Sequence, residues 1–95
     1  MTTYVYPAVF TQYDSVVGIY FPDLDGCISQ GDNYLDAFRS AKEGLSLHLY
    51  GMIKEEYELP PPSRLEDIKL EENEALALIE TEDLDEFEPD WELEE

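Results

Sequence analysis

Apolar residues along the chain follow two periods, one typical of strands and one typical of a helix. Aromatic and β-branched residues dominate positions 4–11 and again positions 16–21, with the polar turn 12–15 between them. Such runs favour strands, and so short a connection favours an antiparallel hairpin. Pro7 has no N–H to donate, so we expect it at a sheet edge or where that donor would face away from a partner.

The string FPDLDGC at residues 21–27 is expected to form the next turn. Pro22 ends the second strand because its ring restricts φ, and Gly26 can adopt the positive φ that a tight turn requires. The short run 27–30 then predicts a third strand. The string therefore marks the point at which the sheet connects to a long helical pattern.

Helical spacing begins at residue 34 and continues to about residue 56. Asn33 is a favourable N-cap, and Asp36 three positions later provides an imperfect capping box. Gly44 and Gly51 weaken a helix, so at least one of them is expected to mark close packing. The apolar stripe at three- and four-residue steps consists of Ala37, Phe38, Ala41, Leu45, His48, Leu49 and Met52.

Prolines at 60–62 end the helix and predict an extended connector before a last apolar run at 75–81. We expect this run to be a strand that returns by crossover, parallel to an earlier strand, with a short helix as the alternative. The predicted fold class is α+β, in the order β-β-β-α-β, with one helix on one face of a four-stranded mixed sheet. Aromatic strand residues such as Tyr4 and Tyr6 are candidates for contacts with a partner or a second copy on the open face.

Charge divides the chain into two parts. The net charge is −19, and residues 82–95 contain nine acidic residues and no basic one, which leaves −10 for residues 1–81. We therefore predict one domain at 1–81 and an acidic, flexible tail at 82–95. Such charge disfavours nucleic acid and anionic lipid and favours basic partners. Phe87 and Trp91 interrupt the acidic run and could dock on the domain or a partner, or simply punctuate a disordered tail.

Residue types that carry chemistry are few. Cys27 is the single cysteine and is expected to be a buried apolar group rather than a nucleophile. His48 is the single histidine and stands among apolar residues, so we expect a packed or half-exposed ring rather than a base or metal ligand. The predicted turns contain four aspartates, which are common in turns for local reasons: Asp14, Asp23, Asp25 and Asp32.

Two targeting signals are absent from the sequence. No apolar run approaches the roughly 20 residues of a membrane span. The first residues also lack the basic and apolar regions of a signal peptide. With one cysteine and no candidate cofactor site, we expect a cytoplasmic protein without cofactors.

Four strings carry a resemblance to a known family. They are YPAVF at 6–10, FPDL followed by Gly26 and Cys27, QGD at 30–32 and ELPPPS at 58–63. The helix segment 41–51 and the last strand around 76–80 add to it, so the likeness spans residues 4–81. In this order and spacing the chain resembles the HicB antitoxins of bacterial and archaeal toxin–antitoxin pairs.

The resemblance implies a partial RNase H-like fold and a protein that binds HicA, a small basic mRNA-cleaving toxin, and occludes its active site. The acidic domain agrees with such a partner, because opposite charges speed encounter. We also expect a homodimer or a higher homo-oligomer. Two features depart from the family: Asp25 stands where Pro is usual, and no basic DNA-binding segment follows Thr81. Direct DNA binding is therefore not expected.

Two other functions stay open. An orphan HicB-like module would bind another protein through the open sheet face, without a toxin. A metal-dependent nuclease would need carboxylates that hold two metal ions, as an RNase H-like fold suggests. Because the aspartates are explained by turns, we expect no catalytic residue and no enzyme.

Overall fold

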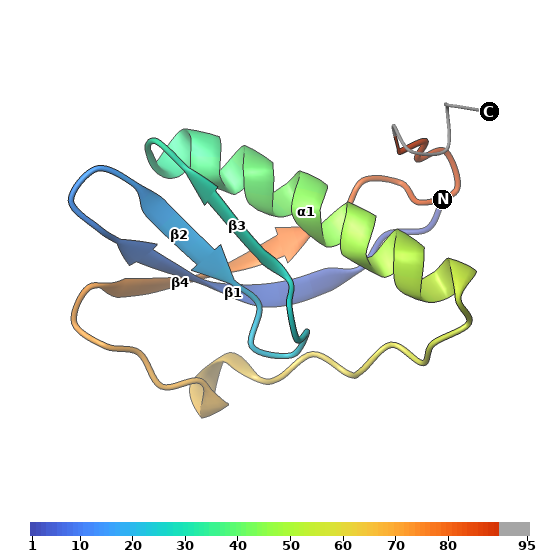
Figure 1. Ribbon diagram of the computed structural model, residues 1–95. Coiled ribbons are helices and arrows are strands. Elements are labelled where there is room, and N and C mark those ends of the chain that lie inside the picture. The colour runs from blue at the N-terminus through green and yellow to red at the C-terminus, as the bar shows by residue number, and fades with distance from the viewer. Residues whose placement is uncertain (90–95) are drawn as a thin grey trace.

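The computed structural model describes residues 1–89, and in this part of the chain four strands and one α-helix follow the predicted order β-β-β-α-β (Figure 1). The strands are β1 (Val5–Gln12), β2 (Val17–Tyr20), β3 (Ile28–Gly31) and β4 (Glu74–Glu80). Helix α1 spans Tyr34–Lys54, and a short 3-10 helix, η1 (Leu65–Asp67), lies in the connector to β4. The α+β class is confirmed, while its partial RNase H-like assignment stays a prediction.

The sheet has the order β3-β2-β1-β4, and every neighbouring pair of strands is antiparallel. The expectation of a mixed sheet with a parallel last strand is therefore wrong. The reason lies in the connector 55–73, which runs back along the sheet after α1 (Figure 1). Helix α1 reverses the chain direction once and the connector reverses it again. The chain therefore enters β4 from the opposite end of the sheet, and β4 pairs antiparallel with β1.

Pro7 lies in a central strand without breaking a hydrogen bond. The amides of Gln12 and Thr81 donate to Asn73 and Tyr4, so even-numbered residues of β1 bond to β4 and odd-numbered residues face β2. Strand β2 ends at Tyr20, and the register continued by two residues would place Pro7 opposite Pro22. The missing N–H thus faces a position with no strand partner, as the sequence led us to expect.

Helix α1 begins where its cap was predicted. The side chain of Asn33 accepts a hydrogen bond from the Asp36 amide at 2.9 Å. The Asp36 carboxylate reaches the Asn33 side-chain amide at 3.4 Å, rather than the backbone N–H of a complete capping box. The cap fixes the start of the helix directly after β3.

Helix α1 packs closely on one face of the sheet because the contact surface is lined by small residues. A Cβ on Gly31 would lie 2.3 Å from the Ala37 nitrogen, and one on Gly44 would lie 2.5 Å from Ser29 Oγ. Gly44 therefore marks close packing, whereas a Cβ on Gly51 would meet nothing within 4 Å. The core beneath the helix includes Tyr6, Ala8, Phe10, Val17, Ile19, Ala37, Ala41, Leu45, Leu49 and Ile79.

The opposite face of the sheet is only partly covered. Pro7 and Val9 are buried along its centre. Around these two residues the face exposes large apolar side chains: Val5, Tyr20, Ile28 and Leu78. None of the helices in the described residues 1–89 is long and apolar enough to cross a membrane.

Candidate partner-binding surfaces

The two candidate tyrosines are Tyr6 in β1 and Tyr4 directly before this strand. Both lie on or near the side of the sheet that α1 covers. Tyr6 is buried in the core, and its hydroxyl donates a hydrogen bond to the Pro60 carbonyl at 2.5 Å. Burial, and next the charge of Asp23, raises the pKa of Tyr6. Tyr4 is partly buried against the same core. The open face instead exposes Tyr20 of β2 and Tyr13, whose ring lies beside Gly18, and the sequence reasoning singled out neither residue.

Residues 82–89, here called the return segment, lead from β4 back over α1 (Figure 1). The buried Ser46 hydroxyl accepts a hydrogen bond from the Glu82 amide at 2.9 Å and donates one to the Lys42 carbonyl at 2.8 Å. Leu84 joins the core, and the Phe87 ring meets the Tyr50 ring edge-on at 5.6 Å. The segment therefore packs on the domain. The boundary at residue 81 and the flexible tail stay predictions, and Trp91 lies outside the described residues.

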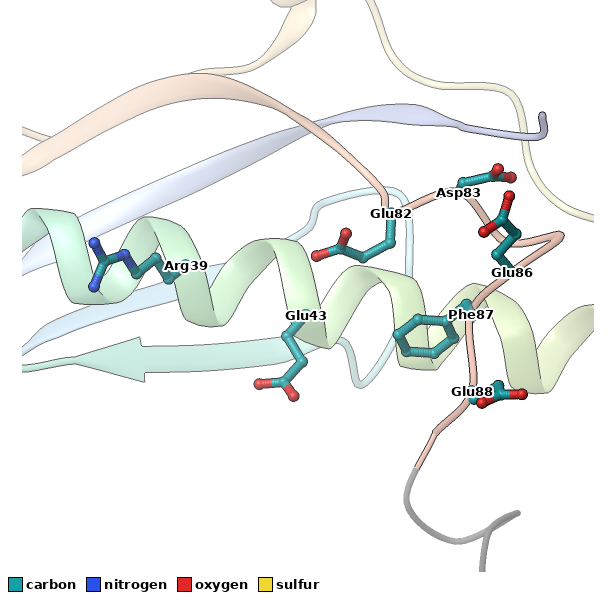
Figure 2. Close-up of a pocket in the computed structure, with 7 residues that line it drawn as sticks. All are labelled: Arg39, Glu43, Glu82, Asp83, Glu86, Phe87 and Glu88. Carbon is teal, nitrogen blue, oxygen red and sulfur yellow. The ribbon is translucent and has the colours of Figure 1, made fainter.

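A groove of about 540 Å³ separates the return segment from α1. Figure 2 shows Arg39 and Glu43 on the helix side and Phe87 directed toward the helix from the return segment. Among the lining residues five are acidic: Glu43, Glu82, Asp83, Glu86 and Glu88. The backbone N–H of Thr2 donates to Asp83 at 2.9 Å and lowers the pKa of that carboxyl. The groove is therefore strongly anionic around one half-buried aromatic ring.

The turn 21–27 has a structural role that extends beyond the turn itself. Its backbone closes through hydrogen bonds between Phe21, Leu24 and Cys27, and Gly26 adopts a φ of +80°. The Asp23 carboxylate accepts from the Ser63 amide at 2.8 Å and also from the Ser63 hydroxyl. Asp23 thus ties the proline-rich connector to the turn.

A second cavity of about 560 Å³ opens beside the same turn. It is lined by Asp23, Leu24, Asp25, His48, Met52, Tyr57 and Pro60. The His48 side chain is half-buried, as expected for a packed ring. Cys27 is buried, and burial raises the pKa of its thiol to about 11, so it is protonated at neutral pH and a poor nucleophile.

The aspartates of the predicted turns do not form a metal site in the described residues. Asp23 and Asp25 border the second cavity, whereas Asp32 lines a separate hollow with Arg39. Among residues 1–89 no group of three or more His, Cys, Asp or Glu side chains is arranged to hold a metal ion. In the described residues the carboxylates of these turns therefore lie in separate places rather than in one cluster.

Known proteins resemble this chain in sequence and in fold. A family model described as HicB_like antitoxin of bacterial toxin-antitoxin system matches residues 6–88. An uncharacterized 14.9 kDa protein in the rep-hol intergenic region of Haemophilus phage HP1 (strain HP1c1) is 34% identical over 62 residues, which cover 65% of this chain and 47% of that protein. The chain thus spans about half the length of this curated relative.

Three solved structures share the fold. A toxin–antitoxin complex from Streptococcus pneumoniae superposes with a TM-score of 0.82 at 19% identity, over 94% of this chain and 76% of that chain. The Burkholderia pseudomallei antitoxin HicB gives 0.70 at 23% identity, over 80% and 61%. A HicA3 and HicB3 toxin–antitoxin complex gives 0.64 at 26% identity, over 83% and 99%.

The matched region runs from β1 through α1 and β4 into the return segment, so it includes every element of the fold. Because this match covers most of its length, the chain belongs to the HicB-like antitoxin family of bacterial toxin–antitoxin systems.

Proposed function

We propose that the chain neutralises a small basic mRNA-cleaving toxin of the HicA type by binding it and occluding its active site. The family match over residues 6–88 carries this proposal. The likeness to a HicA3 and HicB3 complex, at 26% identity and over almost the whole of the matched chain, supports it. In this function the chain is a binding protein with a partial RNase H-like fold and not an enzyme.

The charge of the molecule suits such a partner. A toxin that cleaves RNA must present basic residues to the phosphate backbone, and those residues attract acidic surfaces. The chain supplies a net charge of −19, and five acids line the groove beside Phe87. Opposite fields of this kind raise the association rate and oppose binding to nucleic acid.

The proposed contacts follow from where the candidate residues lie. Phe87 borders the acidic groove and Tyr4 is partly buried near the start of β1, so both can meet a partner with little rearrangement. Tyr6 would need the connector at Pro60 to move first, because its hydroxyl bonds there. Trp91 completes the proposed aromatic set. We further propose a cytoplasmic homodimer or higher homo-oligomer that does not bind DNA directly.

The direct test combines purified chain with a purified HicA-type toxin and a labelled mRNA substrate. We expect stoichiometric chain to suppress cleavage, with binding that weakens as salt screens the charges. Full cleavage in the presence of excess chain would contradict the proposal for that toxin. If the chain instead binds a protein without ribonuclease activity, the function is that of an orphan interaction module.

The acidic groove is tested separately from the fold. Deletion of residues 82–95 would also remove Leu84 from the core, so the sharper variant is Glu86→Gln with Glu88→Gln, both exposed. We expect weaker toxin binding and a smaller salt dependence. Glu55→Gln together with Glu58→Gln, exposed positions outside the groove, is the matched control. Equal affinity of both pairs would assign the groove acids to solubility alone.

A further inference from the structure

The free edge of β4 differs from the rest of the sheet surface. β4 lies at one end of the order β3-β2-β1-β4, so its outer side has no strand partner among the described residues. It is seven residues long, whereas the other edge strand, β3, has four. Long edge strands with apolar side chains are templates for an added strand unless charges or bulges protect them.

The hydrogen-bond register shows which groups this edge presents. The Thr81 amide donates to the Tyr4 carbonyl and the Gln12 amide donates to the Asn73 carbonyl. In an antiparallel ladder such pairs alternate, so odd-numbered residues of β4 bond to β1 and even-numbered residues point outward. The outward N–H groups are therefore those of Leu76, Leu78 and Glu80.

The same outward residues define a side-chain pattern. Their side chains lie on the sheet face opposite α1, with Leu78 53% exposed and Leu76 half-buried. Glu74 and Glu80 stand at the two ends of the strand. An incoming strand thus meets two leucines between two carboxylates, spaced six residues apart.

We propose that the β4 edge accepts an extended segment of a basic partner protein as a fifth strand, with Lys or Arg opposite Glu74 and Glu80 and apolar residues between them. The partner's basic character rests on the proposed function, whereas the free edge does not. Backbone hydrogen bonds would hold the strand, and the carboxylates would select its charge.

A second copy of the chain fits this edge less well. A two-fold β4–β4 pair centred on Ala77 would place Glu74 opposite Glu80 at both ends, and like charges directly opposite one another are destabilising. Each copy also carries a net charge of −19. Charge complementarity therefore favours a basic segment over self-pairing.

The first test uses two synthetic heptapeptides that share the central sequence Thr-Val-Thr-Val-Thr, which places Val opposite Leu76 and Leu78. One peptide has Lys at both ends and the other has Glu. Amide hydrogen exchange of the full chain is measured by NMR. With the Lys peptide we expect slower exchange at Leu76, Leu78 and Glu80 only, because Ala77 and Ile79 are already bonded to β1. No slowing, or equal slowing by the Glu peptide, would overturn the proposal. Concentration-dependent protection in the free chain would assign the edge to a second copy instead.

The second test uses variants and a HicA-type toxin. Leu78→Pro removes an outward N–H without touching the β1 ladder, and we expect about tenfold weaker binding or more. Leu78→Thr keeps that N–H and should bind more tightly than the proline variant. Glu80→Lys should also weaken binding, whereas Glu55→Lys at the end of α1 is the matched charge control.

These outcomes separate the two proposals. A toxin that is bound and inhibited while the outward amides of β4 exchange as in the free chain would refute the edge and leave the proposed function standing. Protection by the Lys peptide without any toxin binding would refute the function and retain the edge.

Discussion

The two faces of the sheet are treated differently by the rest of the chain. On the α1 side, the helix, the turn 21–27 and the return segment all add apolar residues to one core, from Leu24 to Leu84. On the other side, Ile28 is 73% exposed and Leu78 53% exposed, while only the centre around Val9 is closed. The first face stabilises the fold, and the second leaves apolar surface and a strand edge available to a partner.

This difference separates stability from binding. A substitution of a core residue on the α1 side should change the free energy of unfolding, because these side chains are buried. A substitution on the exposed face should change partner affinity with little effect on folding. The chain doubles back after β4 toward the closed side, where the Glu82 amide donates to Ser46 and Leu84 packs in the core.

The largest effect is expected from a cavity in the core. Leu45 is fully buried, so Leu45→Ala should lower the free energy of unfolding by about 2–5 kcal/mol. Ile28→Ala on the exposed face should change it by no more than about 0.5 kcal/mol. Urea unfolding followed by circular dichroism measures both. Similar losses for the two variants would show that the faces are not distinct.

An intermediate effect is expected where the return segment meets the helix. Ser46→Ala leaves the Glu82 amide without its acceptor in a part-buried position, and we expect a loss of about 1–3 kcal/mol. Hydrogen exchange at the Glu82 amide should accelerate. Ser40→Ala is a helix control, because Ser40 takes part through its backbone carbonyl, which accepts from Ser29. An unchanged Glu82 exchange rate would exclude Ser46 as the anchor.

The smallest effect near neutral pH concerns Cys27. Burial raises the pKa of its thiol to about 11, whereas in the unfolded chain the pKa is near 9. The native state therefore keeps the proton longer, so this contribution to stability is lost as pH rises from about 9 to about 11. At pH 8 a thiol reagent should label the native chain far more slowly than the chain in urea. Equal labelling rates would show that the thiol is accessible.

Much of the fold was predictable because local signals agreed with it. Asn33 capped the helix as expected, Gly26 took a positive φ and Gly44 marked close packing. The predicted apolar stripe is not fully buried, because Phe38 is 46% exposed. The centroid of its ring nevertheless lies 6.3 Å from that of Phe10. Helical period locates a stripe, but the width of the sheet beneath decides how much of it is covered.

The direction of β4 was predicted wrongly because the apolar pattern of a strand does not indicate whether it runs parallel or antiparallel to its neighbour. A strand after a helix is parallel only if the helix itself is the crossover, and here the connector 55–73 adds a second pass along the sheet. The contact between Asp23 and Ser63, forty residues apart, holds that pass in place. No periodicity reports such a contact.

By itself, the sequence determined the number and order of the strands and the α-helix, their approximate bounds, the acidic charge and the resemblance to the family. These properties depend on residues close together in the chain or on simple composition. Only the tertiary structure decided that Tyr6 is buried, that residues 82–89 pack on α1 and that β4 presents Leu76 and Leu78 at a free edge. Those properties depend on contacts between segments that are distant in the sequence. Such contacts are selected by how much apolar surface the whole folded chain buries, and no local pattern reports that.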